Sequence, residues 1–233
     1  MSTPEPLRAA RLELQRVATH ILARARFQSD GRVGLRVTPG GIGTPLFGSP
    51  ASVVRITGSM VVRESESEGA PRTETMSIDG HSITELARFA HVDLQAPFAA
   101  GSDTPELGST EAPIAIEERT AAEVMAWHAL GAEALDLVLP LVEEPSIAQL
   151  WPEHFDVAFD ALTARGRVNV GASPGDLSYP EPYLYVAPWE GDRPGDPTFW
   201  NAPFGAVMTK SEGIDSAESA ASFLERGLRT LAE

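Results

Sequence analysis

The sequence contains no cysteine, and this absence excludes several classes of protein at once. A disulfide framework, a thiolate metal site and a cysteine nucleophile all need that side chain, which rules out zinc fingers, thioredoxin-like proteins and cysteine proteases. Basic residues are scarce as well. Lys and Arg number 18 against 33 Asp and Glu, for a formal net charge of -15. Such a chain repels polyanions, so we expect it to bind neither nucleic acid nor an anionic membrane.

Long apolar runs and signature motifs are also missing. No stretch reaches the roughly 20 apolar residues that span a bilayer, and the N-terminus lacks the basic cluster and apolar run of a signal peptide, so we expect a cytoplasmic protein. The glycine-rich stretch 38–45 lacks the Gly-Lys-Ser/Thr ending of a phosphate-binding loop. Neither Ser173 nor Ser178 lies in a Gly-x-Ser-x-Gly nucleophile elbow. The sequence therefore identifies no catalytic residue, metal or cofactor.

The hydrophobic residues that are present make up 42% of the 233 residues, enough to bury a core. They recur at helical spacing in four stretches and alternate with polar residues in shorter ones. The predicted helices are 5–26, 82–91, 120–142 and 216–232, and the predicted strands are 32–37, 53–62, 72–78, 154–162, 167–172, 182–188 and 204–209. The acidic run 64–68 is expected to form a solvated turn. The strands are linked by turns and do not alternate strictly with helices, which predicts an α+β fold with a mainly antiparallel sheet flanked by helices.

A short pattern occurs twice in the chain. Gly31-Arg-Val is followed by Thr38-Pro-Gly40, and Gly166-Arg-Val is followed at the same spacing by Ser173-Pro-Gly175. A true duplication would give two pseudo-symmetric helix–sheet–helix halves. We place these halves at residues 1–92 and 119–233, with a linker at 93–118 that is rich in small residues, proline and acid. One compact domain is the alternative.

Two predicted helices carry residues that invite a functional interpretation. Trp127 and His128 are adjacent in the third helix, and we interpret them as a packing aromatic residue beside a boundary histidine in preference to a cofactor contact. Ser82 and Glu85 have the spacing of a capping box, which predicts where the second helix begins.

Polar side chains at alternate positions mark the strands of the second half as a candidate site. Residues two apart on a strand share a face, so each set of alternate residues points the same way and together they would line a polar pocket with aromatic walls. The candidate ligand-binding residues are His154, Asp156, Asn169, Glu181, Tyr183 and Tyr185. An imidazole and a carboxylate two residues apart also suit a divalent metal or an acid–base pair. The alternative is a sheet with one wetted face, whose polar residues need no function.

Three motifs in this region carry a family resemblance. They are Leu150-Trp-Pro-Glu-His-Phe-Asp156, Gly171-Ala-Ser-Pro-Gly-Asp176 and Glu181-Pro-Tyr-Leu-Tyr-Val186. They resemble the runs Leu-Trp-Pro-His-His-Phe-Asp, Gly-x-Ser-Pro-Gly-Asp and Glu-Pro-Tyr-Phe-Tyr-Val of a group of uncharacterised bacterial proteins. The resemblance implies a shared fold and no reaction. The chain departs from the group at Glu153, where the group has histidine, and this departure speaks against a two-histidine metal site.

These observations lead to three hypotheses about function. The first is a cytoplasmic protein that binds a small molecule on the polar face of the central sheet. The second is a metal- or histidine-dependent hydrolase or isomerase, with His154 as general base and Asp156 or Glu181 orienting it or holding a metal. The third is a non-catalytic module that buries the same face in a homodimer.

Overall fold

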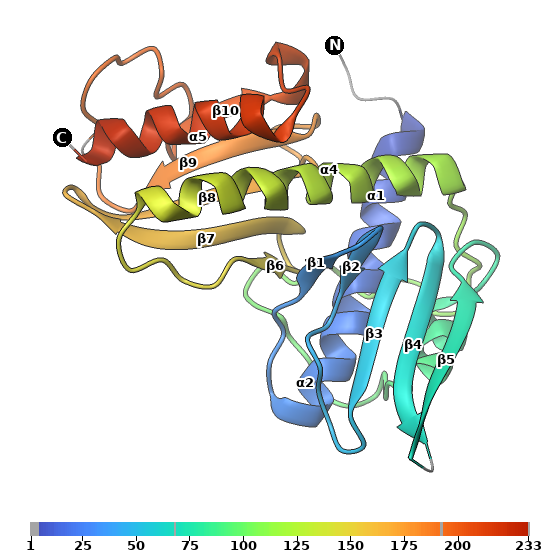
Figure 1. Ribbon diagram of the computed structural model, residues 1–233. Helices are drawn as coiled ribbons and strands as arrows, with labels where there is room; N and C mark the ends of the chain where they lie inside the picture. The colour runs from blue at the N-terminus through green and yellow to red at the C-terminus, as the bar shows by residue number, and fades with distance from the viewer. Residues whose placement is uncertain (1–4, 68, 192, 233) are drawn as a thin grey trace. The chain divides into compact units, whose positions relative to one another are not determined.

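The computed structural model describes residues 5–67, 69–191 and 193–232, which fold as two compact units (Figure 1). The first-sheet unit comprises the described chain up to Ala126 together with Leu150–Phe155, and the second-sheet unit comprises Trp127–Gln149 and the chain from Asp156 onward. The division differs from the predicted halves in three ways. It falls inside a helix, the segment 93–118 that we expected to be a linker belongs to the first-sheet unit, and so does Leu150–Phe155 from the predicted second half.

The first sheet is an antiparallel meander of five strands in chain order. Its strands are β1 (Arg36–Thr38), β2 (Gly41–Gly43), β3 (Ser52–Thr57), β4 (Met60–Ser67) and β5 (Ala70–Ser77), of which β2 was not predicted. The prediction of one strand over 53–62 is wrong, because Gly58, at φ 57°, makes a tight turn between β3 and β4. The acidic turn over 64–68 is also wrong for residues 64–67, which continue β4. A strand tolerates Glu64 there because Arg55 donates to its carboxylate; Glu68 lies outside the described residues.

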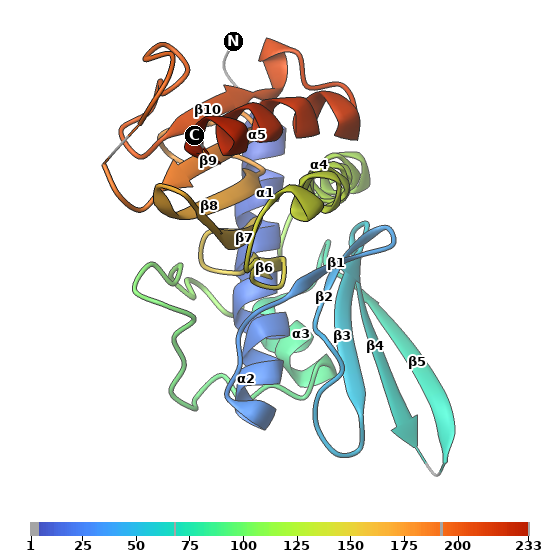
Figure 2. The same ribbon diagram turned by 60° about the vertical axis from the view of Figure 1, so that its left-hand side comes forward.

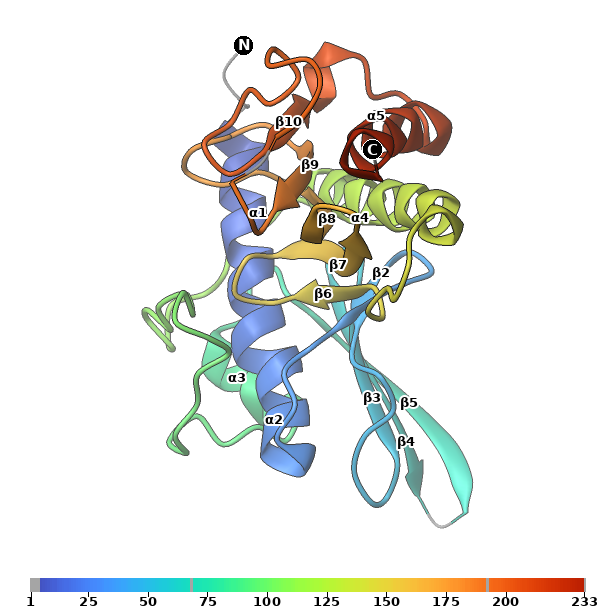
Figure 3. The same ribbon diagram turned by 90° about the vertical axis from the view of Figure 1, so that its left-hand side faces the viewer.

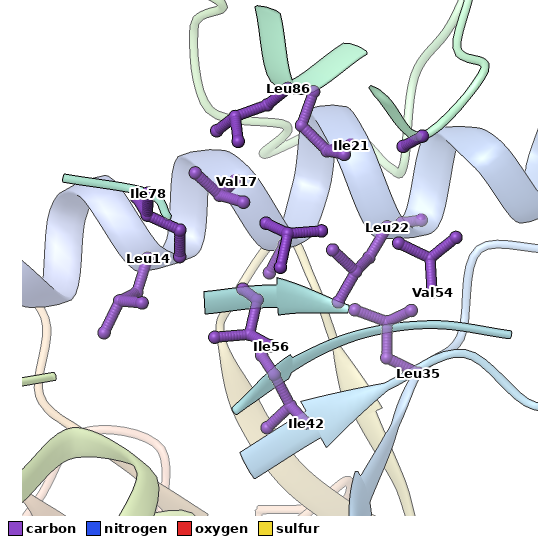
Figure 4. Close-up of a cluster of buried hydrophobic side chains, with 14 of the residues drawn as sticks. Leu14, Val17, Ile21, Leu22, Leu35, Ile42, Val54, Ile56, Ile78 and Leu86 are labelled. Carbon is purple, nitrogen blue, oxygen red and sulfur yellow. The ribbon is translucent and has the colours of Figure 1, made fainter. Parts of the chain in front are cut away.

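A continuous helix and a short one cover one side of β3–β5 (Figure 2). The long helix consists of α1 (Glu5–Val17), the π-helical segment η1 (Ala18–Ala23) and α2 (Arg24–Asp30). The short helix α3 (Ile83–Phe89) begins at Ser82, whose side chain forms the predicted capping box with Glu85. Both predicted helices are confirmed. Their apolar stripes meet the sheet in a core that Figure 4 shows, with Leu14, Val17, Ile21, Leu22, Leu35, Ile42, Val54, Ile56, Ile78 and Leu86 labelled.

The second sheet also has five antiparallel strands, in the order β10-β9-β8-β7-β6. They are β6 (Gln149–Trp151), β7 (Asp156–Thr163), β8 (Gly166–Ser173), β9 (Tyr183–Pro188) and β10 (Ala206–Thr209), of which β6 was not predicted. The later part of α4 (Glu118–Val138) and α5 (Ala217–Ala232) lie on one side of β7–β10 (Figure 3). Glycines allow this close packing, since a Cβ at Gly131 would lie 2.4 Å from Ala172 and one at Gly227 would lie 2.9 Å from Val186. The predicted α+β fold is confirmed.

The two copies of the Gly-Arg-Val pattern occupy different structural places. Gly31, at φ 75°, ends α2, whereas Gly166, at φ 101°, opens β8 in the turn that follows β7. Along the chain, each sheet is nevertheless preceded and followed by a helix. The duplication itself stays a prediction.

One helix of the described chain, Glu118–Leu141, is long and apolar enough to cross a membrane by length and composition. It includes α4 and the 3-10 turn η2 (Leu139–Leu141). Buried core helices of soluble proteins meet the same criterion, and 44% of its most apolar window is buried inside the structure. This helix is therefore a weak indication of a membrane span, and the fold as a whole is compatible with a soluble protein.

Candidate functional site

The second sheet has one face covered by helices and one face that carries the predicted polar residues. The register places Ser173 opposite Tyr183 and Gly171 opposite Tyr185, so these residues share a face. Asp156 and Asn169 belong to the same face by alternation along β7 and β8. We call this surface the tyrosine face. It unites four of the six candidate residues.

Tyr185 and Asp156 form a hydrogen-bonded pair on the tyrosine face. The Tyr185 hydroxyl donates to Asp156 Oδ2. Asp156 is only 7% exposed, and Tyr185 is half-buried with its hydroxyl enclosed. Burial raises the pKa of Tyr185 well above its ordinary value, and the negative charge of Asp156 raises it further. The phenol therefore stays protonated near neutral pH.

A glycine makes room for this pair. Gly171 lies directly opposite Tyr185, and a Cβ at Gly171 would lie 2.5 Å from the Tyr185 Cζ and hydroxyl oxygen. No other residue fits there without moving the ring. The position of the Tyr185 phenol thus explains why the Gly-Ala-Ser-Pro-Gly-Asp motif begins with glycine, at Gly171.

Tyr183 forms a second pair, with Asp176. Its hydroxyl donates to Asp176 Oδ2 at 2.6 Å, while Asp176 Oδ1 accepts the backbone N–H groups of Ser178 and Tyr179 at 2.6 and 2.7 Å. Burial raises the pKa of Tyr183 and Asp176 raises it further, whereas a hydrogen bond with Ser173 acts in the opposite direction. Sequence reasoning did not name Asp176 as a site residue. Its position after Pro-Gly, where an Asp side chain caps a turn, was the available signal.

Aromatic rings surround the two pairs. The Tyr183 and Tyr185 centroids are 6.2 Å apart, and Tyr179 lies 5.2 Å from Tyr183. Phe204 meets Tyr179 and Tyr185 edge-on at 6.1 and 6.4 Å. Phe204 remains 39% exposed and Tyr179 is half-buried, so the cluster keeps an accessible aromatic edge. We had not singled out Phe204 from the sequence.

The prediction that His154 shares a strand face with Asp156 is wrong. His154 lies in the turn before β7 and is exposed. In that turn the Phe155 N–H donates to the Trp151 carbonyl at 2.7 Å, and Phe155 has φ 56°. A left-handed residue interrupts the alternation of side chains, so counting by twos from His154 fails.

Glu181 and Asn169 are also placed differently from the prediction. Glu181 precedes β9, so it does not extend the alternation of Tyr183 and Tyr185; a hydrogen bond with Ser211 lowers its pKa. Asn169 lies on the tyrosine face, but its Oδ1 accepts the Trp189 Nε1–H at 2.9 Å. Neither residue joins the two phenol–carboxylate pairs.

The tyrosine face offers hydrogen bonding by neutral phenols that are paired with carboxylates, together with aromatic contact. Both phenols are protonated and already donate to carboxylates, which leaves their oxygens as acceptors. Within the described residues, no group of three or more His, Asp or Glu side chains is arranged to hold a metal ion.

Comparison with known proteins assigns the chain to no family. No family model matches the chain, and no curated protein or solved structure shows significant similarity to it. The resemblance of the three motifs to a bacterial group therefore stays a prediction.

Proposed function

We propose that the protein is a small-molecule-binding protein whose second-sheet unit holds its ligand on the tyrosine face. The observation that carries this proposal is the pair of adjacent phenol–carboxylate hydrogen bonds on β9, bordered by the accessible edges of Tyr179 and Phe204. Small-molecule binding sites combine an apolar or aromatic wall with a few fixed polar groups.

The fitting ligand is a neutral ring compound that carries hydroxyl or amino groups. Its ring would contact Tyr179 and Phe204. Its donors would reach the phenol oxygen of Tyr185, which is enclosed in the structure, so binding requires the exposed Phe204 side chain to move aside. An anionic ligand is disfavoured there, because the carboxylates of Asp156 and Asp176 lie beside the phenols. Tyr185 is thus the residue that sets the ligand's position.

Binding is favoured over the hydrolase or isomerase hypothesis. A general base needs a pKa near the working pH and a place beside the reacting atom. The pKa values of Tyr183 and Tyr185 are raised away from that range, and His154 is not on the face. A cytoplasmic location is part of this proposal, and burial of the face in a homodimer stays a prediction.

A binding screen with two tyrosine variants tests the proposal. The panel consists of glucose, ribose, adenosine and thymidine, with Kd measured by calorimetry. Tyr185→Phe should weaken any binding at least about tenfold, a typical cost for losing one ligand hydrogen bond. Tyr179→Phe is the matched control because it removes a hydroxyl that makes no hydrogen bond within the described chain and keeps the ring. Equal binding by wild type and Tyr185→Phe would remove the tyrosine face as the site.

A further inference from the structure

A groove in the first-sheet unit has a different chemical character from the tyrosine face. Its volume is about 470 Å³, within the range of small-molecule pockets. One wall is the sheet, with Val54 and its register partner Arg63; another is formed by α2 with Ser29 and by His91 after α3; the third is the turn at Phe47–Pro50. The groove therefore lies between the sheet and its covering helices.

This groove is free of acidic residues. None of its lining residues is Asp or Glu, although the chain contains 33 of them. A hollow bordered by the outward-facing side of the same strands is lined by Glu64 and Glu66, and one at the start of α4 is lined by Asp79, Glu117 and Glu118. The groove is thus a local exception to the negative charge of the molecule.

Arg63 supplies the positive charge. Its Nη1 donates to Glu74 Oε2 at 3.0 Å, and its side chain is 15% exposed. Glu74 also accepts from Arg72 Nη2 at 2.8 Å, so two guanidinium groups share one carboxylate and the cluster keeps a net positive charge. Nε and Nη2 of Arg63 have no acceptor among the described residues. A guanidinium with two donors to spare suits a bidentate carboxylate or phosphate.

His91 reaches the groove from a strained backbone position. It follows α3 at φ 59°, and the next N–H, that of Val92, donates to the Ala87 carbonyl at 2.8 Å. This arrangement at a helix end favours glycine, because a Cβ in the left-handed region is sterically costly. A histidine in a backbone conformation that suits glycine better is locally unfavourable, and such residues are concentrated at functional positions.

The rest of the lining combines apolar residues with the polar residues Gln28, Ser29, Ser49 and Ser52. Phe47, Pro50 and Val54 form a wall beside the small residues Ala25 and Ala90. We infer that the groove binds a small organic acid, with its carboxylate or phosphate group held by Arg63 and His91 and its apolar body against Phe47, Pro50 and Val54. This site is independent of the tyrosine face.

Three probes of similar size test the inference by calorimetry at constant ionic strength. They are 3-phenylpropionate, phenyl phosphate and the neutral 3-phenylpropanamide. At least one anionic probe should bind at least about tenfold more tightly than the amide, because only an anion can form two charge-assisted hydrogen bonds with Arg63. The comparison of the two acids tells which anionic group the site prefers. Absence of binding by both acids up to about 10 mM, or equal binding of the amide, would overturn the inference.

Arg63→Gln should reduce acid binding at least about tenfold. This variant is expected to fold, because Glu74 keeps its partner Arg72. Arg55→Gln is the matched control: Arg55 is on the same sheet and pairs with Glu64, but it does not line the groove. Equal loss in both variants would show that general charge, and not the groove, attracts the acid. Tyr185→Phe should leave acid binding unchanged.

A second substitution separates binding from folding. His91→Gly should raise the melting temperature, since it relieves the left-handed backbone, and at the same time weaken acid binding. Glu144→Gly relieves another left-handed residue, at φ 45°, which does not line the groove, and should leave binding intact. Full acid binding by His91→Gly would remove His91 from the site.

Discussion

The two sheets are both antiparallel meanders, but they differ in their most buried polar side chains. Each carries a partly exposed ion pair, which is Arg167 with Asp160 on the second sheet. On the first sheet, Arg63 and Glu74 form a partly exposed ion pair at 3.0 Å, and Arg55 does the same with Glu64 at 2.8 Å. On the second sheet, the phenols of Tyr183 and Tyr185 are buried and neutral, each hydrogen-bonded to a carboxylate. Solvent screens exposed charges, whereas a buried acceptor that loses its donor keeps its full desolvation cost. The second sheet should therefore be far more sensitive to the loss of a single polar group.

Protonation of His128 should have the largest effect in the second-sheet unit on the free energy of unfolding. This histidine lies on α4 in the second-sheet unit and is completely buried, so the interpretation as a boundary histidine is wrong. Burial lowers its pKa from 6.5 to about 3. Because the unfolded chain takes up the proton at its ordinary pKa, stability is lost as the pH falls from 6.5 toward 3. The loss is about 2 kcal/mol by pH 5 and about 4 to 5 kcal/mol in full. Urea unfolding at pH 7 and pH 5, with His128→Gln as the variant that does not titrate, measures it. The same pH dependence in both proteins would contradict the expectation.

Gly171→Ala should come next. The added Cβ would lie 2.5 Å from the Tyr185 phenol and displace it from Asp156, at a cost of about 2 to 3 kcal/mol in the free energy of unfolding. Gly191→Ala is the control, since a Cβ there would have no neighbour within 4 Å. Denaturant titrations of the two variants should differ by most of that amount. Equal midpoints would mean that the Tyr185 ring moves freely.

Tyr183→Phe should be milder. It removes the 2.6 Å hydrogen bond to Asp176, but the backbone N–H groups of Ser178 and Tyr179 remain on that carboxylate. We expect a loss of about 1 to 2 kcal/mol by chemical denaturation. Tyr179→Phe, measured alongside, should change stability by less than about 0.5 kcal/mol.

Arg55→Gln on the first sheet should have the smallest effect, between 0 and about 1 kcal/mol, and the difference from wild type should shrink as salt is added. Thermal unfolding at low and high salt measures it. A salt-independent loss of several kcal/mol in the free energy of unfolding would contradict the expected difference between the two sheets.

Periodicity predicted most of the fold. All four helices and most strands were found because apolar residues recur at helical or alternating spacing, and the Ser82 capping box was recognised from two residues. The errors lie where a strand or turn has no apolar pattern to mark it. They are the missed short strands β2 and β6, the Gly58 turn, and the continuation of β4 through Glu64, which depends on a cross-strand arginine.

The candidate site was predicted in part for the same reason. Tyr183 and Tyr185 alternate along one strand, so their shared face could be deduced. The predicted position of His154 was wrong because Phe155 adopts a left-handed conformation, which no feature of the sequence indicates. The groove at Arg63 and His91 was missed altogether, since its residues come from segments distant in the chain and meet only in the folded unit.

The most direct test of the account is an alkaline titration of the tyrosines, followed by NMR of ¹³Cζ-labelled phenols. The tyrosine face consists of neutral phenols hydrogen-bonded to carboxylates, and we propose that this surface serves binding and not proton transfer. We predict that Tyr183 and Tyr185 keep their protonated signals well above their ordinary pKa of 10.0 for as long as the protein stays folded. Ionisation of either phenol at or below pH 10.0 in the folded protein would contradict it.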